Sequence, residues 1–300
     1  MPPPPIPAPA AGAGQISAYE EVKPLGKGAF GMVYLVRERA TKRKWVMKRV
    51  ALKGMQPRER QSAFQEARLL QRLRHPHICS YQDSFVNKPT NQLCLVMTFC
   101  PGGDMHGFVQ DHKKRNKRVA EEQIVQWLLQ LTLALEYIHD RHIIHRDLKT
   151  QNVFLMDDRS LKLGAAGDTS PRLHLASPHL APPHPAGDFG VSRVLESPTD
   201  LARTCVGTPY YMCPELMRRQ RYSNKADMWA LGCIVYELAT LKHAFDAKDM
   251  DGLTMKIVRG RYPPISATHY SKAPSAPAPA SAPASASAPP SPSPPPSPSP

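Results

Sequence analysis

The apolar periodicity of the chain changes near residue 104, and this change constrains the fold more than any other feature. Between residues 19 and 98, short apolar runs alternate with turn residues, and "VYLVRERATKRKWVMKRV" predicts two strands joined by a polar turn. One predicted helix, Glu59–Arg74, interrupts the strands. Beyond residue 104 the spacing is mainly helical, with an amphipathic helix through Ile124–Ile138 and a helix at Ala226–Thr240 that is apolar nearly all round. The pattern predicts a strand-rich first part and a helical second part.

Proline marks three segments that do not fit either pattern. The 33 prolines crowd into the N-terminus, the stretch 165–187 and the chain after residue 273. These segments lack periodic apolar residues and cannot bury enough surface to offset the entropy of ordering. We therefore expect disordered segments at 1–18 and 273–300, and a folded domain at 19–272 that carries an irregular insert at 165–187.

The chain is strongly basic, with 39 Lys and Arg against 25 Asp and Glu, a formal charge of +14. Such a surface favours anionic partners. The densest basic run, "HKKRNKR" (His112–Arg118), fits a nuclear signal or nucleic-acid patch, or a solvated loop between two helices. No aromatic residue interleaves with the run, which disfavours nucleic acid as a partner. We expect a solvated loop.

The cysteines and the apolar runs indicate the compartment. The six cysteines form no CxxC pair, and several lie inside apolar runs, so free thiols in a reducing compartment are expected. No apolar run reaches transmembrane length, and the N-terminus lacks the features of a secretory signal. The sequence predicts a soluble intracellular protein without a membrane partner.

The glycine-rich stretch "GKGAFGMV" (Gly26–Val33) follows the start of one strand and leads into another. Its glycines allow backbone N–H groups to approach phosphate oxygens. A flexible hairpin or a dinucleotide site would share the glycine spacing, but a dinucleotide loop should open a helix. Lys48 lies on the next strand, where its amine could reach phosphates under the loop. Glu66, on the helix 59–74, could hold Lys48 through an ion pair.

The strongest chemical motif is "HRDLKTQN" (His145–Asn152), which matches a phosphotransferase catalytic loop in full. In this pattern Asp147 accepts the proton of a substrate hydroxyl, and Lys149 neutralises charge on the transferred phosphoryl group. Asn152, five residues after Asp147, can ligate a metal. "DFG" supplies a second metal-binding carboxylate, Asp188, and "GTPYYMCPE" follows it at a distance that makes a loop between two anchors.

Together these motifs resemble the eukaryotic protein kinases, and more narrowly the NIMA-related (Nek) serine/threonine kinases. The resemblance rests on "HRDLKTQNVFL", "DFGVSR", "ARTCVGTPYYMCPE", "MWALGCIVYELATLKHAF" and "RGRYPPIS", and covers about residues 19–272 apart from the insert. It implies an α+β bilobal fold. The small β-rich N-lobe would span 19–97, the hinge 98–103, and the larger, mainly α-helical C-lobe 104–272.

The resemblance implies that ATP binds between the two lobes. Val33 and Val46 would cover one face of the adenine and Phe154 the other, with Met97 as gatekeeper. Residues 98–100 would offer backbone hydrogen bonds, and Asp104 would lie near the ribose. The residues implied to contact ATP are Leu25, Gly26, Lys27, Gly28, Ala29, Phe30, Gly31, Val33, Val46, Lys48, Met97, Thr98, Phe99, Cys100, Asp104, Phe154 and Asp188.

The resemblance also assigns the catalytic roles. Asp147 would be the catalytic base, and Asn152 and Asp188 would hold Mg²⁺. Lys149, two residues past Asp147, is typical of the serine/threonine class. Asp227 matches a buried aspartate that anchors the catalytic loop.

The implied regulatory residues lie mainly in the segment before "PE". Thr204 would be the site of activating phosphorylation by another kinase, and Arg146 would receive its phosphate. Thr208 would brace the catalytic Asp and Lys.

Two segments depart from the family pattern. Removing 165–187 joins "LKLG" to "DFGVSR" and restores a short hairpin, so this stretch is interpreted as an insert, either a retained in-frame intron or a lineage-specific loop. After "RGRYPPISATHYSK" the family would continue into two more helices, one carrying an arginine that pairs with Glu215. Here the sequence becomes rich in Pro, Ala and Ser, so we expect an incomplete C-lobe.

The expected function is an ATP- and Mg²⁺-dependent kinase that phosphorylates serine and threonine of protein substrates. The family resemblance suggests a cytoplasmic protein with centrosomal, ciliary or nuclear roles. The alternative is a catalytically impaired kinase-fold scaffold, or a mis-spliced or truncated product. A basic nucleic-acid binder is the least supported interpretation, because it depends on charge alone.

Overall fold

The computed structural model describes residues 15–28, 31–164, 209–218, 220, 223–266 and 268–270. Residues 266–300 form a unit separate from the rest of the chain. Its described part contains a turn in which the amide of His269 donates to the carbonyl of Ser266. No helix within the described ranges is long and apolar enough to cross a membrane.

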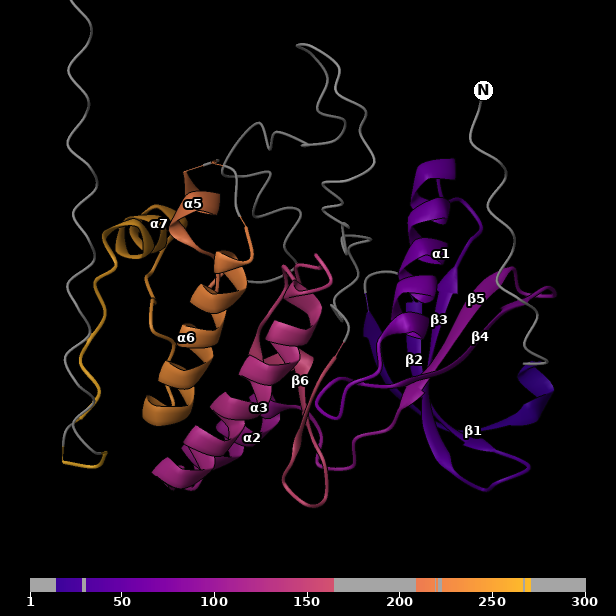
Figure 1. The fold of residues 1–300 in the computed structure, drawn as a ribbon, viewed down its shortest axis with the longest axis horizontal. Coiled ribbons are helices and arrows are strands. Elements are labelled where there is room, and N and C mark those ends of the chain that lie inside the picture. Colours follow the sequence, from indigo (N-terminus) through magenta and orange to yellow (C-terminus); the bar gives the residue numbers. More distant parts are fainter. Residues whose placement is uncertain are drawn as a thin grey trace, which may run out of the picture. The chain divides into compact units, whose positions relative to one another are not determined.

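The first part of the chain forms a five-stranded antiparallel sheet with strand order β1-β2-β3-β5-β4 (Figure 1). The strands are β1 (Tyr19–Gly28), β2 (Gly31–Glu38), β3 (Lys44–Ala51), β4 (Tyr81–Asn87) and β5 (Gln92–Thr98). A short 3₁₀ turn, Ile16–Ala18, precedes β1. The expected strand pair of "VYLVRERATKRKWVMKRV" is confirmed as β2 and β3.

Alternation along the strands divides their side chains between two apolar clusters. On β3, Trp45 and Met47 belong to a core cluster that also contains Val36 and Val96. Val50 and Lys48 lie two residues apart on β3 and share the face opposite to that of Trp45 and Met47. That face packs against helix α1 (Pro57–Arg72) through a second cluster formed by Val50, Leu52, Ala63, Ala67, Leu93 and Leu95.

Helix α1 lies along the sheet (Figure 1) and begins with a capping box. The backbone N–H of Gln56 donates to Glu59 Oε2 over 3.0 Å, and Pro57 takes the first helical position, where its missing N–H has no helical partner to lose. The helix begins and ends two residues earlier than the sequence predicts. The cap at Gln56 explains the early start, and the extended backbone of Leu73 ends the helix before His75-Pro76.

The second part of the chain is mainly helical. Its elements are α2 (Met105–Lys114), α3 (Glu121–His139), the 3₁₀ turn η2 (Thr150–Asn152), β6 (Val153–Leu155), β7 (Leu161–Leu163), α5 (Pro214–Met217), α6 (Lys225–Thr240) and α7 (Met250–Arg259). Helix α6 is buried along most of its length and packs against α3, as its nearly continuous apolar sequence predicts. Helix α7 was not predicted; Asp249 caps it by accepting from Gly252 N over 2.7 Å.

Backbone hydrogen bonds connect the sheet to the β6–β7 hairpin. The segment before β4 bonds to β7, with Cys79 N donating to Leu163 O and Leu163 N to His77 O, both at 2.8 Å. The segment after β5 bonds to β6, with Gly102 N donating to Leu155 O and Leu155 N to Gly103 O, both at 2.9 Å. The hairpin that follows the catalytic motif is therefore fixed directly to both ends of the β4–β5 unit.

Two boundaries differ from the sequence-based expectation. Thr98, expected as the first hinge residue, is the last residue of β5 and pairs with Trp45. The basic run His112–Arg118, expected as a loop, begins inside α2, which extends to Lys114. In both cases regular hydrogen bonding continues beyond the point where the apolar pattern ends.

Candidate active site

One face of the sheet carries the side chains expected to surround ATP. Val33 on β2 lies opposite Lys48 on β3, and Val46 lies opposite Met97 on β5. Directly opposed residues in an antiparallel sheet share a face, and so do residues two apart on one strand. The register therefore places these four side chains on the same face. Gly26 on β1 pairs with Val33 and extends this row.

Lys48 and Glu66 form the expected ion pair between β3 and α1. Lys48 Nζ lies 3.7 Å from Glu66 Oε1, and only 11% and 15% of the two side chains are exposed. Burial raises the pKa of Glu66, and the neighbouring Lys48 ammonium opposes this increase. The pair thus holds Lys48 on the sheet face described above, and it does so with a partly desolvated carboxylate.

The raised pKa of Glu66 predicts how stability depends on pH. A carboxyl group whose pKa is higher in the folded state favours folding most below its unfolded pKa, and this contribution falls as pH rises through the folded value. Glu66→Gln removes the titration. We therefore expect the unmodified protein to lose stability relative to Glu66→Gln as pH rises. The difference in unfolding free energy, variant minus unmodified protein, should increase between pH 4 and pH 8. Urea denaturation across this range measures it, with Glu59→Gln as a control, and a difference that stays flat or decreases contradicts the assignment.

The side chains of the "HRDLKTQN" motif converge on Asp147. Lys149 Nζ lies 3.1 Å from Asp147 Oδ2. The amide of Asn152 donates to the Asp147 carbonyl over 2.6 Å and to Asp147 Oδ2 over 3.0 Å. Asn152 is buried, whereas 36% of the Asp147 side chain is exposed. The loop therefore presents one carboxylate to solvent and holds it from two sides.

Asp227, on the first turn of α6, anchors the backbone of the catalytic loop just before Asp147. Its Oδ2 accepts from the backbone N–H of His145 and from His139 Nε2, both over 2.8 Å, and its Oδ1 accepts from the N–H of Arg146 over 2.9 Å. Burial alone would raise the pKa of Asp227, but these hydrogen bonds and the nearby His145 lower it overall. The expected anchoring role of Asp227 is confirmed.

The anchored backbone has an uncommon conformation. Arg146 has φ of +68°, a region that non-glycine residues rarely adopt. The hydrogen bond from its N–H to Asp227 holds this conformation. Asp227 therefore sets the direction of the chain immediately before Asp147.

Gly164, the last described residue before the expected insert, packs tightly against the same loop. Its N–H donates to Asn152 O over 2.8 Å, and its carbonyl accepts from His145 Nε2 over 2.9 Å. A Cβ at this position would lie 2.6 Å from Cε2 of Phe154. A side chain here would therefore push aside the Phe154 ring that is expected under adenine.

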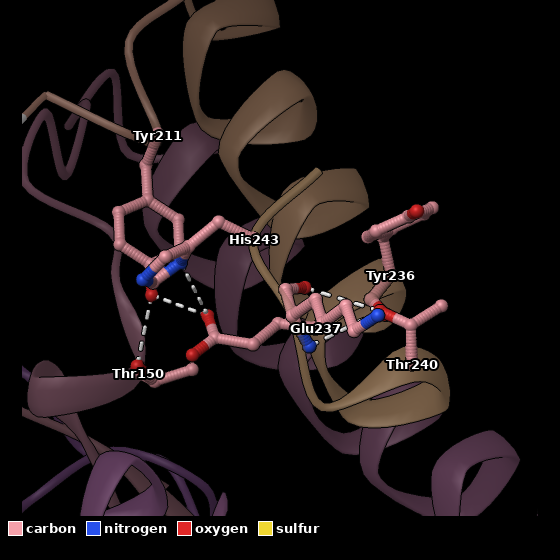
Figure 2. A network of polar contacts seen from close by, with 7 residues as sticks. Thr150, Tyr211, Tyr236, Glu237, Thr240 and His243 are labelled. Atoms are coloured by element: carbon pink, nitrogen blue, oxygen red, sulfur yellow. Dashed lines mark hydrogen bonds and ion pairs between the residues drawn. The ribbon is translucent and has the colours of Figure 1, made fainter. Parts of the chain in front are cut away.

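A second polar network connects the catalytic loop to α6. Figure 2 shows the hydroxyl of Tyr211 between Thr150 and Glu237. Tyr211 donates to Glu237 Oε2, so the 2.9 Å contact with Thr150 Oγ1 is donated by the threonine. His243 Nδ1 lies 3.6 Å from Glu237 Oε2, and its ring stacks on Tyr210. Burial and the Glu237 carboxylate raise the pKa of Tyr211, which therefore stays a donor at neutral pH.

The remaining expected site residues have mixed placements. Asp104 caps α2, with its Oδ1 accepting from Gly107 N over 2.7 Å, so only part of its carboxylate is available to a ribose. Cys100 is buried, and Met97 and Phe99 are half-buried. Leu25 is 44% exposed. Five expected site residues lie outside the described residues: Ala29, Phe30, Asp188, Thr204 and Thr208.

Three residues of the site were missed by sequence reasoning. His139 contacts the anchoring Asp227, Tyr211 contacts the catalytic loop at Thr150, and Glu237 holds Tyr211. Glu237 carried a visible signal, since it is a lone carboxylate in the otherwise apolar stretch "WALGCIVYELAT", and a buried charge requires a partner. His139 and Tyr211 carried none, because their partners are distant in sequence.

Comparison with known proteins identifies the arrangement. The family model for the protein kinase domain matches residues 19–172 and 185–286, and the unmatched residues between them lie within the expected insert. Mouse serine/threonine-protein kinase Nek4 is 42% identical over 249 residues, 83% of this chain and 28% of Nek4. Mouse Nek1 is 40% identical over 84% of this chain and 19% of Nek1. A probable nek3 kinase of Dictyostelium discoideum is 40% identical over 84% of this chain and 21% of that protein.

This chain spans less than a third of the length of each of these three relatives. The match to the family model covers most of the chain and includes the β3 lysine, the catalytic loop and the anchoring aspartate. The chain belongs to the protein kinase family and is similar to the Nek serine/threonine kinases.

Proposed function

We propose that this chain transfers the γ-phosphoryl group of ATP to serine and threonine hydroxyls of proteins. The observation that carries the proposal is the arrangement around Asp147, where Lys149 and Asn152 hold one partly exposed carboxylate in place. Positioned charge of this kind is the main catalytic device in phosphoryl transfer.

Binding of ATP is assigned to the face of the sheet that carries Val33, Val46, Lys48 and Met97. The apolar members would cover the adenine, and Lys48 would contact the α- and β-phosphates. The ion pair with Glu66 supports this role, because a lysine held over 3.7 Å by a buried carboxylate loses less freedom when it binds phosphate.

The donor set fits a magnesium ion in the part that is described. Both hydrogen bonds from the Asn152 amide nitrogen go to Asp147, which leaves Asn152 Oδ1 as an oxygen ligand of the kind Mg²⁺ prefers. Asp188 is proposed as the second ligand. The ion would neutralise charge on the ATP phosphates.

Asp147 is proposed as the base that orients the acceptor hydroxyl and accepts its proton. Lys149 would stabilise the negative charge on the transferred group. The hydrogen bond that Thr150 donates to the Tyr211 hydroxyl supports the loop from the other side, because Thr150 lies between Lys149 and Asn152. The network in Figure 2 therefore helps to position the catalytic side chains.

Regulation is proposed to act through Thr204, phosphorylated by an activating kinase, with Arg146 as the group that receives the phosphate. Thr208 is proposed to brace Asp147 and Lys149. A cytoplasmic location, with centrosomal, ciliary or nuclear roles, is proposed from the likeness to Nek kinases. A phosphopeptide map of active protein tests the regulatory step: full activity without phosphate at Thr204 rules it out.

The test of the proposed function is an acceptor panel. Purified protein is supplied with γ-labelled ATP, Mg²⁺ and three peptides that differ only in carrying Ser, Thr or Tyr. Label on the Ser and Thr peptides, lost when the metal is chelated, supports the proposal. Label on the Tyr peptide alone contradicts the proposed acceptor class.

A further inference from the structure

The chain carries a compact basic surface that the proposed catalytic machinery does not use. Five of the seven residues in the run at 112–118 are Lys or Arg. All five are exposed: Lys113, Lys114, Arg115, Lys117 and Arg118. We call residues 113–118 the basic turn. It lies at the C-terminal end of α2, the helix that begins at the hinge.

The backbone of the basic turn is ordered. Asn116 adopts φ of +49°, Lys117 N donates to His112 O over 2.9 Å, and Asn116 N donates to Lys113 O over 3.2 Å. This pair of hydrogen bonds around a left-handed residue is the Schellman closure of a helix C-terminus. The cations therefore project from a fixed backbone, so less conformational entropy is lost when a partner binds.

Aromatic packing ties the basic turn to the helical core. The His112 ring lies 3.9 Å from that of Phe108, and Phe108 meets Trp127 edge-on at 5.1 Å. Trp127 is fully buried and donates to Arg159 O over 2.8 Å. His112, the only ring of the run, is thus already packed and is unsuited to stacking on a nucleic-acid base.

The charge of the basic turn exceeds what its helix requires. One or two cations in the last turn of α2 would complement the helix dipole, and Lys113 and Lys114 fill this place. Lys117 and Arg118 lie beyond the helix. Within the described part of the chain, none of the five cations forms an ion pair with a carboxylate. Like charges this close repel one another, so an anionic partner would be stabilised at this surface.

The partner is not supplied by this chain. No more than two acidic residues are adjacent anywhere in the sequence, and Lys272 is the only charged residue in 271–300. A membrane surface fits poorly, because stable attachment needs an apolar or lipid anchor beside the cations, and Val119, the apolar residue next to the turn, is buried. Three of the five cations are lysines, which suit a diffuse run of carboxylates better than bidentate phosphate recognition.

We propose that the basic turn docks an Asp/Glu-rich segment of a protein substrate, away from the phosphorylated residue. Helix α2 starts after Asp104. The backbone of Asp104 forms an isolated antiparallel β-bridge with Phe154, beside the catalytic loop. Its ten residues place the basic turn about 15 Å from that point, at about 1.5 Å per residue. An extended peptide covers this distance with about five residues. That the docked protein is a substrate rests on the proposed function, whereas binding of an acidic segment to the basic turn does not.

Binding and transfer are tested separately. Fluorescence anisotropy measures the affinity of the full chain for a labelled peptide that carries five consecutive glutamates. The test variant carries Gln at the five cations of the basic turn. A matched control carries Gln at five exposed cations of the N-lobe: Lys23, Lys53, Arg60, Arg72 and Lys88. A third protein replaces the three lysines of the turn by Arg. Thermal melting verifies that each variant folds.

We expect the Gln variant of the basic turn to bind the acidic peptide at least about tenfold more weakly, given several screened ion pairs. The N-lobe control and the Lys→Arg protein should bind within about twofold of the unmodified chain. In the transfer assay, joining the five glutamates to a serine peptide through a ten-residue linker should lower KM and leave kcat unchanged. The Gln variant of the turn should lose this gain and keep its activity on the peptide without glutamates.

Three outcomes overturn the docking proposal. The N-lobe control could lose as much binding as the turn variant, which would indicate total charge rather than a site. A single-stranded oligonucleotide or a phosphoserine peptide of equal charge could bind the turn more tightly than the glutamate peptide. Binding could also occur without any change in KM. If the peptide binds at the turn but no serine peptide is phosphorylated, the proposed function fails and the basic turn remains a docking surface for acidic segments.

Discussion

Replacing Asp147 by Asn is expected to reduce kcat by about 10²–10⁴, the usual contribution of a positioned general base. The change removes the proton acceptor but nearly preserves the shape of the side chain. Asn152 still donates to the backbone carbonyl of residue 147, since that bond does not involve the side chain. The loop should therefore keep its position, and the affinity for ATP and the melting temperature should change little. Steady-state kinetics with a serine peptide and isothermal titration with ATP measure the two effects.

Asp157→Asn is the matched control for this experiment. Asp157 is an exposed carboxylate in the turn between β6 and β7, and it lies outside the cluster around Asp147. The same chemical change there should leave kcat within about twofold, as expected for a surface substitution. Equal losses in both variants, or a Asp147→Asn protein with unreduced kcat, would contradict the role of Asp147.

The largest expected loss of stability follows from Asp227→Ala. Three donors point at the carboxylate, and its removal leaves the N–H groups of His145 and Arg146 without acceptors in the interior. Breaking a buried charged network of this kind costs about 3–5 kcal/mol. That is a large share of the total stability of a domain, about 5–15 kcal/mol. Arg146 would also lose the bond that holds its positive φ.

Asp249→Ala provides the comparison for the anchor. Asp249 also accepts a backbone hydrogen bond, from Gly252, but it is an exposed helix cap. Loss of such a cap costs about 1 kcal/mol. Chemical denaturation of the two variants should show a loss at least about twice as large for Asp227→Ala. Similar losses in the two proteins would show that Asp227 does not anchor the loop.

The fold and the catalytic core could be predicted from the sequence because their signals are local. The alternation in "VYLVRERATKRKWVMKRV" specifies β2 and β3, and the apolar stretch 226–240 specifies a central helix. The spacing within "HRDLKTQN" brings Asp147, Lys149 and Asn152 together, because residues at most five positions apart in one loop stay close in space. The pairing of Lys48 with Glu66 was also correct, and here the family resemblance supplied what spacing alone left open.

The parts that escaped prediction depend on contacts between segments distant in sequence. His139 reaches Asp227 across 88 positions, and Tyr211 reaches Thr150 across 61. No local pattern encodes such contacts, because each side chain is ordinary for its own helix or turn. The N-cap role of Asp104 was missed for a different reason, since the same carboxylate fits both a helix start and a ribose contact. The order of the basic turn was missed because charge runs resemble solvated loops until the αL position of Asn116 is known.

The most direct test of the central claim is phosphoamino-acid analysis after a single turnover. The unmodified chain, saturated with γ-labelled ATP and Mg²⁺, is mixed with a serine peptide, in parallel with Asp147→Asn. The account predicts labelled phosphoserine with the unmodified chain and a rate lower by about 10²–10⁴ with Asp147→Asn. Binding of ATP by both proteins, with equal and negligible transfer, would contradict the account and favour a kinase-fold scaffold.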